Sequence, residues 1–399
     1  MIAGLRRHLE EMRYEANCLR RGHYPSFVAA RSPDVDPQDV PVFVFHTIDP
    51  EEFEEQLRHL ADNDYQALDC ATFHAYLTGA AKIASRSVLL TIDDGRASVW
   101  IYALPLLKKY GLKAVVFLIP GYIREAASLA PTLEEVWAGR ARPDGPPNRD
   151  PELMNWSEVR AAAESGLIDF QSHTLYHHRV PVSRRIVDYI NPQMSHALFD
   201  VPVALGQEGQ LRAEGIDGLL GAPVYESDSL MAGRSIYRPD PRLARVCIDY
   251  VRRMGEHTFF RSPGWRKDLA RLTADWRERH DDQGGFDDAS AVARELATDL
   301  RRSRALIEQR LPGTEVRHLC YPYTVGSEAA VRASRDAGYL TNFWGVLPDR
   351  RTNRAGNDPY HCPRLKGDYL QRLPGRGRNT LTGILARKIS RRVRSKPVY

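Results

Sequence analysis

Cysteine is scarce in this 399-residue sequence, and its pattern excludes two common uses. The five cysteines are odd in number and scattered, and no two have the spacing of a metal knuckle or a redox pair. No apolar run approaches the length that spans a membrane, and charges recur too often near the N-terminus for the apolar region of a signal peptide. We therefore expect a protein of a reducing, cytoplasmic compartment.

Acidic residues are missing from residues 371–399, where nine basic residues lie. The formal net charge is +5, so the rest of the chain carries 5 − 9 = −4. Leu381, Leu385, Ile389 and Val393 recur at four-residue steps among the basic residues, as in an interfacial helix that contacts anionic membrane peripherally. A disordered or domain-packing tail is the alternative. Since its only aromatic residue is the last one, no nucleic-acid partner is expected.

Short apolar runs alternate with helical patterns along most of the chain. Alternation of this kind predicts parallel strands that are covered on both faces, hence an α/β sheet or barrel. The predicted strands are residues 41–47, 87–93, 113–121, 167–173, 316–323 and 339–345. The predicted helices are residues 51–63, 103–111, 156–166, 289–311 and 328–338.

The same pass along the chain predicts three parts. Residues 1–40 form an amphipathic helix over 2–19 and a proline-containing linker, residues 41–370 form the barrel, and residues 371–399 form the basic tail. The alternation lapses over about 192–285, which we interpret as an insertion or lid. Aromatic and basic residues there could hold a glycan or a pyrophosphate-linked sugar, or build a small core of their own; they are Arg234, Tyr237, Arg261 and Trp265.

Two polar motifs follow predicted strands. Asp93 and Asp94 come directly after the run VLLTI, and His173 and His177 lie at the end of LIDFQSH and four residues beyond. Each motif alone has an ordinary reading, a capped turn for the aspartates and a chance spacing for the histidines. Strand ends of a parallel barrel meet on one rim, however, and together these side chains offer the two-histidine, one-carboxylate set of a divalent transition metal site.

The segments LTIDDG, SHTLYHH and CYPYTVG, in this order and spacing, resemble the polysaccharide deacetylases, the group that contains the nodulation-type chitooligosaccharide deacetylases. The resemblance covers about residues 41–192 and 290–365. It implies a distorted (β/α) barrel with about seven strands, an inserted lid region and helical extensions at both ends. It also implies metal-dependent removal of an acyl group from a sugar.

Residue by residue, the resemblance implies that Asp93 is the catalytic base and that Asp94, His173 and His177 bind the metal ion. Tyr323 matches the position whose backbone N–H holds the oxyanion. The sequence departs from the family pattern in two places. Cys320 replaces the arginine that orients the base, so that group is absent or comes from elsewhere. A leaving-group histidine motif is not found either; His361 or Arg364 in DPYHCPRL could serve, or could be structural.

The sequence therefore predicts a hydrolase that removes an N-acetyl or other acyl group from an amino sugar in a polysaccharide, an oligosaccharide or a lipid-linked glycan. One divalent transition metal is expected, Zn²⁺ first, with Co²⁺, Ni²⁺, Fe²⁺ or Mn²⁺ as alternatives. A barrel that binds carbohydrate or a partner without turnover stays open as a second function, and so does a deformylase or an amidase acting on a non-sugar. The oligomeric state is left open.

Overall fold

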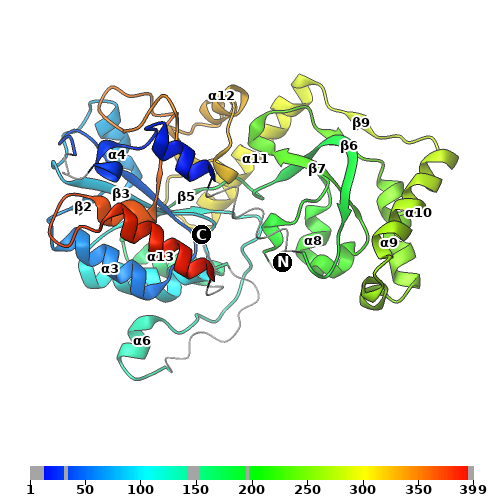
Figure 1. Cartoon of the computed structure of the whole chain (residues 1–399), viewed down its shortest axis with the longest axis horizontal. Coiled ribbons are helices and arrows are strands. Elements are labelled where there is room, and N and C mark those ends of the chain that lie inside the picture. The colour runs from blue at the N-terminus through cyan, green and yellow to red at the C-terminus, as the bar shows by residue number, and fades with distance from the viewer. Residues whose placement is uncertain (1–12, 31–34, 142–152, 195–196, 394–399) are drawn as a thin grey trace.

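The computed structural model describes residues 13–30, 35–141, 153–194 and 197–393, with only the backbone at Ile389 and 391–393. Its centre is a parallel sheet (Figure 1). Seven strands form the main path: β1 (Val42–Phe45), β3 (Ser87–Ile92), β4 (Ala114–Leu118), β5 (Ile168–Ser172), β10 (His318–Cys320), β11 (Thr341–Phe343) and β12 (Leu365–Lys366). Their order is β11-β10-β5-β4-β3-β1-β12, and β2 (Gln66–Ala67) pairs with β3 outside this path.

The sheet returns on itself through one short segment. Cys362 forms a parallel bridge with Phe343 at the end of β11, and Leu365 of β12 pairs with Phe43 of β1. The same segment thus joins both edges of the sheet and makes it a distorted barrel of parallel strands. The predicted fold class is confirmed.

Alternating side chains of the barrel strands pack into two cores. Every residue of β3 and β4 is buried. Leu89, Val115 and Phe117 belong to one apolar cluster, which also includes residues of α4, while their strand neighbours Leu90 and Val116 belong to a larger one. Because both faces are covered, these strands read in the sequence as continuous apolar runs.

Helices pack around the barrel, and the five predicted ones are present. They are α3 (Pro50–Ala61), α5 (Leu104–Tyr110), α7 (Trp156–Glu164), α11 (Ala289–Arg310) and α12 (Glu328–Asp336). Local signals set their ends: the Asp49 side chain accepts from the Glu52 N–H at the start of α3, and Gly111 takes φ 64° after α5. Three short helices were not predicted: α2 (Ser26–Ala29), α4 (Cys70–Leu77) and α6 (Leu133–Trp137).

An additional lobe lies beside the barrel between β5 and α11 (Figure 1). It contains two antiparallel strand pairs, β6 (Arg179–Tyr189) with β7 (Pro223–Ser229) and β8 (Tyr237–Arg238) with β9 (Gly285–Phe286). Its helices are α8 (Glu208–Glu214), α9 (Pro241–Arg253) and α10 (Trp265–Arg279). β6 precedes residue 192, where the predicted insertion begins, but it pairs with β7 and so belongs to the same lobe. We call this lobe, from β6 to β9, the insertion.

The described parts of both terminal extensions pack together. Residues 13–20 are helical, whereas the rest of the predicted helix over 2–19 lies outside the described residues. α13 (Leu381–Val393) follows the turn η7 (Gly367–Arg372). Lys388 of α13 is buried and forms ion pairs with Glu15 and, at 3.1 Å, with Asp368. These contacts hold the described part of the tail on the protein itself, so they give no support to the predicted membrane contact.

All five cysteines are buried, free thiols. Within the described residues, no helix combines the length and the apolar character that a membrane crossing requires.

Loss of one partner of the buried Lys388–Glu15 pair should destabilise the protein strongly. Lys388→Met leaves the Glu15 carboxylate, 5% exposed, without its closest cation. We expect the free energy of unfolding to fall by about 3–5 kcal/mol in urea titrations, because an unpaired buried charge loses its solvation without compensation. The double variant Glu15→Leu/Lys388→Met should recover most of that loss.

Arg387→Met is the matched control, because Arg387 pairs with Glu55 in an exposed position on the same helix. It should change the stability by less than about 1 kcal/mol. Equal losses for the two single variants would show that the buried pair does not hold the extensions in place.

Candidate active site

Two aspartates and two histidines meet at the carboxyl ends of the barrel strands. Asp93 and Asp94 follow β3, and His173 and His177 follow β5. The backbone turns sharply at both places, with φ 72° at Asp94 and 56° at His177. Gly95 is required in the first turn, because its φ is 76° and a Cβ atom there would lie 2.6 Å from Leu118 Cδ2.

Asp94, His173 and His177 form a buried group whose ligand atoms all lie within 4.8 Å of one another. His173 Nδ1 lies 2.9 Å from the Cys320 carbonyl oxygen, which requires a proton on Nδ1 and leaves the Nε2 lone pair facing Asp94 Oδ1 at 3.7 Å. His177 Nδ1 is buried without a hydrogen-bond partner among the described residues. This donor set and the orphaned nitrogen fit a divalent transition metal.

Asp93, His173 and Cys320 make a second group of the same kind, but it fits a metal less well. The carboxylate of Asp93 is already bound by an arginine. Burial raises the pKa of the Cys320 thiol well above its usual value, and the thiol donates to Asp93 Oδ2 at 3.5 Å. A protonated thiol is a poor ligand.

The Arg364 guanidinium holds Asp93 from a distant part of the chain. Its two terminal nitrogens donate to the two carboxylate oxygens at 2.7 and 2.8 Å, and Arg364 is only 2% exposed. Burial by itself would raise the pKa of Asp93, but Arg364 and His173 outweigh it and hold that pKa well below its usual range. Arg364 comes from the segment that closes the barrel, so an arginine does lie beside Asp93 although Cys320 stands at the position where the family resemblance implies one.

Asp94 and His177 are also held in the protonation state that metal binding needs. Burial would raise the pKa of Asp94, yet His46 and Arg96 outweigh it and keep that pKa below its usual value. Arg96 Nε donates to Asp94 Oδ2 at 2.9 Å. Burial lowers the pKa of His177 to about 3, so its imidazole is neutral at pH 7.

Tyr323 lies against this cluster. Its ring centroid is 4.4 Å from that of His177, and its hydroxyl donates to the His177 carbonyl oxygen at 3.3 Å. The backbone at Tyr323 is left-handed, with φ 57°, in the turn that follows β10. Asp200 of the insertion lies 3.8 Å from His177 Nδ1 and accepts from the Tyr323 hydroxyl at 3.4 Å, so the insertion reaches the site.

The structure places His361 away from the cluster and His46 beside it. His361 Nδ1 lies 2.7 Å from Asp358, and its ring stacks on Trp344; no described contact joins it to the cluster. His46, which the sequence analysis missed, follows β1 and has its Nε2 atom 3.9 Å from Asp93 Oδ2. The rule applied to the other motifs, a polar side chain directly after an apolar strand, also fits FVFHT and would have found it.

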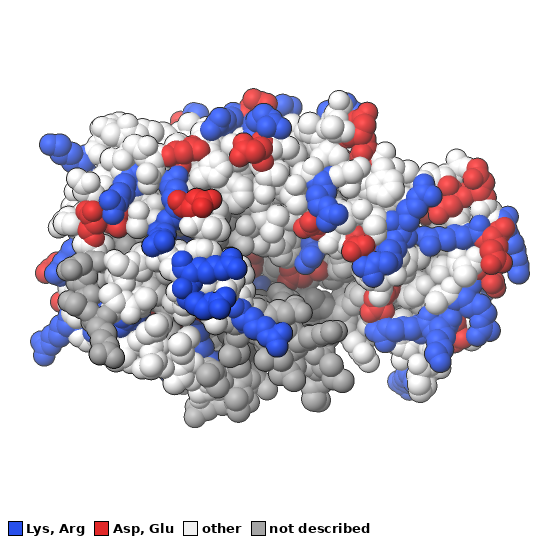
Figure 2. All heavy atoms as spheres, turned by 45° about the horizontal axis from the view of Figure 1, so that its top comes forward, with Lys and Arg blue, Asp and Glu red and all other residues white. Residues whose placement is uncertain are grey.

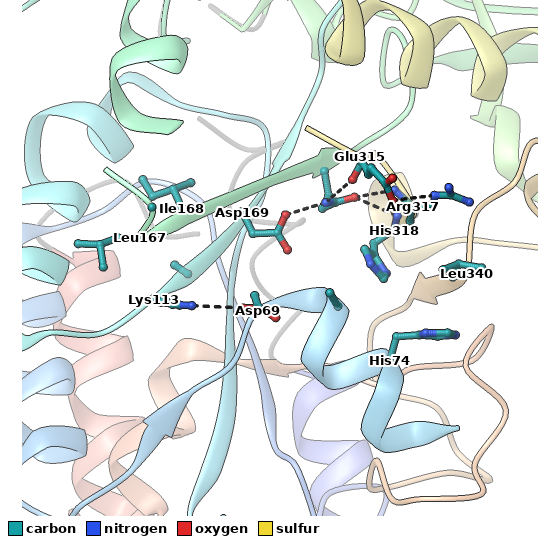
Figure 3. A pocket seen from close by; sticks show the side chains of 14 residues that line it. Asp69, His74, Lys113, Leu167, Ile168, Asp169, Glu315, Arg317, His318 and Leu340 are labelled. Atoms are coloured by element: carbon teal, nitrogen blue, oxygen red, sulfur yellow. Dashed lines mark hydrogen bonds and ion pairs between the residues drawn. The ribbon is translucent and has the colours of Figure 1, made fainter. Parts of the chain in front are cut away.

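A separate cavity of about 440 Å³ opens at the other end of the strands (Figure 3). Ala114, Ile168 and His318 line it, and each begins its strand. Asp69 forms an ion pair with Lys113 there at 3.3 Å. Among the described residues this cavity holds no group of metal-ligand type, and in parallel barrels this end serves stability while chemistry takes place at the carboxyl ends.

Comparisons with known proteins match the motif-bearing part of the chain. Residues 80–198 match the family model described as polysaccharide deacetylase. YxkH of Bacillus subtilis strain 168, a protein named for the polysaccharide deacetylases, is 36% identical over 91 residues, which are 21% of this chain and 33% of YxkH. The poly-beta-1,6-N-acetyl-D-glucosamine N-deacetylase of Staphylococcus aureus strain MSSA476 is 26% identical over 129 residues, 32% of this chain and 37% of that protein.

The chain thus spans about a third of the length of the curated relatives it matches. Among solved structures, a de-N-acetylase from Aggregatibacter actinomycetemcomitans aligns over 82% of this chain and 94% of its own, with 16% identity and a TM-score of 0.48. Asp93, Asp94, His173 and His177 all lie within the segment that matches the family model. By that match and by the motifs it contains, this part of the chain is similar to the polysaccharide deacetylase family.

Proposed function

We propose that the protein is a metal-dependent hydrolase that removes an N-acetyl or other acyl group from an amino sugar in a polysaccharide, an oligosaccharide or a lipid-linked glycan. One observation carries the proposal: the Asp94, His173 and His177 group lies beside a second carboxylate, Asp93, that Arg364 holds ionised. The names of the relatives support amide hydrolysis on N-acetylated sugars as the reaction class. The cytoplasmic location stays a prediction from the sequence.

Asp94, His173 and His177 would hold the metal ion, with Zn²⁺ as the first candidate because of its preference for nitrogen and carboxylate ligands in this set. When bound, the ion supplies Lewis-acid polarisation and lowers the pKa of water. The chain prepares for this by keeping His177 neutral and by fixing the orientation of His173 through Cys320.

Asp93 would accept the proton of the attacking water. Both of its oxygens are bound by Arg364, which orients the carboxylate and keeps it ionised through the neutral pH range. The backbone N–H of Tyr323 would donate to the oxyanion, as the family motif implies. Because Arg364 would take the orienting role left open at Cys320, the lack of an arginine at that position does not favour a barrel that binds carbohydrate without turnover.

His46 would give the proton to the leaving amine. It lies beside Asp93 at the end of the neighbouring strand, and its side chain is 32% exposed, so a substrate can reach it. His361 is the weaker candidate, because its ring is occupied by Trp344 and its nitrogens face Asp358 and Glu328.

Acetate and formate release from nucleotide-linked, lipid-linked and polymeric N-acylated amino sugars tests the function. The parent protein loaded with Zn²⁺ should release one of the two acids, and Asp93→Asn should lower the rate at least 10²-fold, because general base catalysis contributes about 10²–10⁴. Asp93→Asn should still bind the ion, whereas Asp94→Ala should lose both the ion and the activity.

Metal content measured after gel filtration separates these two variants. Full activity of Asp93→Asn would contradict the assignment of the base. Acid release that persists in Asp94→Ala and after chelation would contradict the metal site itself.

Arg364→Met tests the pairing that holds the base. We expect at least a 10²-fold loss of activity, and a free energy of unfolding lower by about 3–5 kcal/mol, because Asp93 is left buried without its cation. The double variant Asp93→Asn/Arg364→Met should recover stability but no activity. Arg335→Met is the control, since its pair with Asp358 is half exposed and 3.9 Å long; an equal effect of the two single variants would refute a special role for Arg364.

His46→Gln and His361→Gln separate the two candidate acids. His46→Gln should lower kcat by about 10²-fold or more at unchanged metal content, because the leaving amine then departs without a positioned acid. His361→Gln should stay within about threefold of the parent protein. The reverse order of the two effects would return the role to His361.

A further inference from the structure

Arginines are numerous in the insertion, and most of them are paired with carboxylates. Figure 2 shows basic and acidic side chains interspersed over this part of the surface. The paired arginines are Arg185 with Glu226, Arg234 with Asp228, Arg238 with Asp287, Arg242 with Asp240, Arg252 with Asp249, Arg266 with Asp188, Arg271 with Asp268 and Arg277 with Asp282. A paired guanidinium is already neutralised, so these groups are not available as anion sites.

Three of the four residues that the sequence suggested for glycan binding, Arg234, Tyr237 and Trp265, make contacts within the insertion, and the fourth, Arg261, is exposed. Tyr237 is buried against Tyr225 and Phe286, and Trp265 is buried against Phe260. Arg234 belongs to an ion pair with Asp228 at 3.2 Å. These contacts correspond to the alternative of a small separate core.

Arg179 differs from these arginines in its place and in its partners. It is the first residue of β6, two residues after His177, and it is exposed. Its guanidinium carbon lies 5.0 Å from the ring centroid of Tyr323, and the Tyr323 ring also contacts the ring of His177. Among the described residues no carboxylate pairs with the Arg179 guanidinium. The one hydrogen bond that this guanidinium makes to them is a long one, 3.5 Å to the Ser227 carbonyl oxygen.

The charged groups around Arg179 leave room for an external anion. Asp200 is the nearby acid, but its oxygen faces the Tyr323 hydroxyl and His177. Asp228 and Glu226 on the facing strand β7 are bound by Arg234 and Arg185. The planar fork of an arginine presents paired donors to a carboxylate or a phosphate, and such charge-assisted bonds are strong.

From this geometry, and resting on the proposed function, we propose that Arg179 binds an anionic group, a carboxylate or a phosphate, of the sugar substrate whose acyl amide lies at the metal site. The enzyme then prefers acidic glycans or glycosyl phosphates over neutral N-acetylated oligosaccharides. Tyr323 holds the guanidinium by a cation–π contact and so sets the distance between the anion and the reacting amide.

Three N-acetylated oligosaccharides of equal length test the proposal: a neutral one, one with a uronate next to the acetylated sugar, and one with a phosphate there. For the parent protein, kcat/KM should be higher for one or both acidic substrates. Arg179→Gln should lower the ratio of acidic to neutral kcat/KM by about 10- to 100-fold, the weight of a charge-assisted hydrogen bond. Arg179→Lys should retain part of the preference.

Arg184→Gln is the matched control. Arg184 lies on the same strand, is exposed, has a tyrosine ring at 5.9 Å and donates to a carbonyl oxygen, but its described contacts lie within the insertion. It should leave the ratio unchanged. If Arg179→Gln lowers kcat/KM equally for the neutral and acidic substrates, Arg179 has only the structural role of packing against Tyr323. That result would overturn the proposal.

Calorimetric binding of the same oligosaccharides to the metal-loaded Asp93→Asn variant separates the two hypotheses. If the parent protein releases neither acetate nor formate from any substrate, the hydrolase is refuted. The anion site is kept in that case if an acidic oligosaccharide binds more tightly than the neutral one and this difference depends on Arg179. Equal binding of the neutral and both acidic oligosaccharides would refute the anion site, whatever the activity. Which of the two acidic substrates binds tighter identifies the anion as carboxylate or phosphate.

Discussion

The bidentate pair between Asp93 and Arg364 connects the chemistry of the site with the closure of the barrel. Asp93 ends β3, and Arg364 lies between Cys362, which bridges to β11, and β12, which pairs with β1. Each charge is almost completely buried, and without the other each would carry a large desolvation cost. Two further donors of Arg364 bind Thr91 Oγ1 and the Trp344 carbonyl oxygen, so the guanidinium also joins β3 to the end of β11.

Unusual backbone conformations bring the other groups of the site together. Asp94, His177 and Tyr323 all have left-handed φ angles, at turns after β3, β5 and β10. Each such residue costs on the order of 1–3 kcal/mol, which persists only where the surroundings fix the conformation. The buried strands supply this rigidity, and the turns direct the side chains toward one point above the barrel.

The insertion supports the site from outside the barrel. Phe199 packs edge-on against the ring of His177, and Glu208 Oε1 lies 3.2 Å from His178 Nε2. On the barrel side, Asp299 of α11 accepts the Leu175 N–H at 3.1 Å. The loop that carries both histidines is therefore held from two sides, while the insertion keeps apolar cores of its own.

Local sequence determined the elements: continuous apolar runs predicted the main strands, periodic runs predicted five helices, and the strand-end motifs identified Asp93, Asp94, His173 and His177. These signals are readable because parallel strands are buried on both faces and their carboxyl ends share one rim. Only the tertiary structure decided which residues meet across long separations in sequence. Arg364 reaches Asp93 across 271 positions, and His46, rather than His361, lies beside Asp93. The periodicity of a sequence carries no distance information over such a range, because the curvature of the barrel and the path of its closing segment decide which strand ends become neighbours.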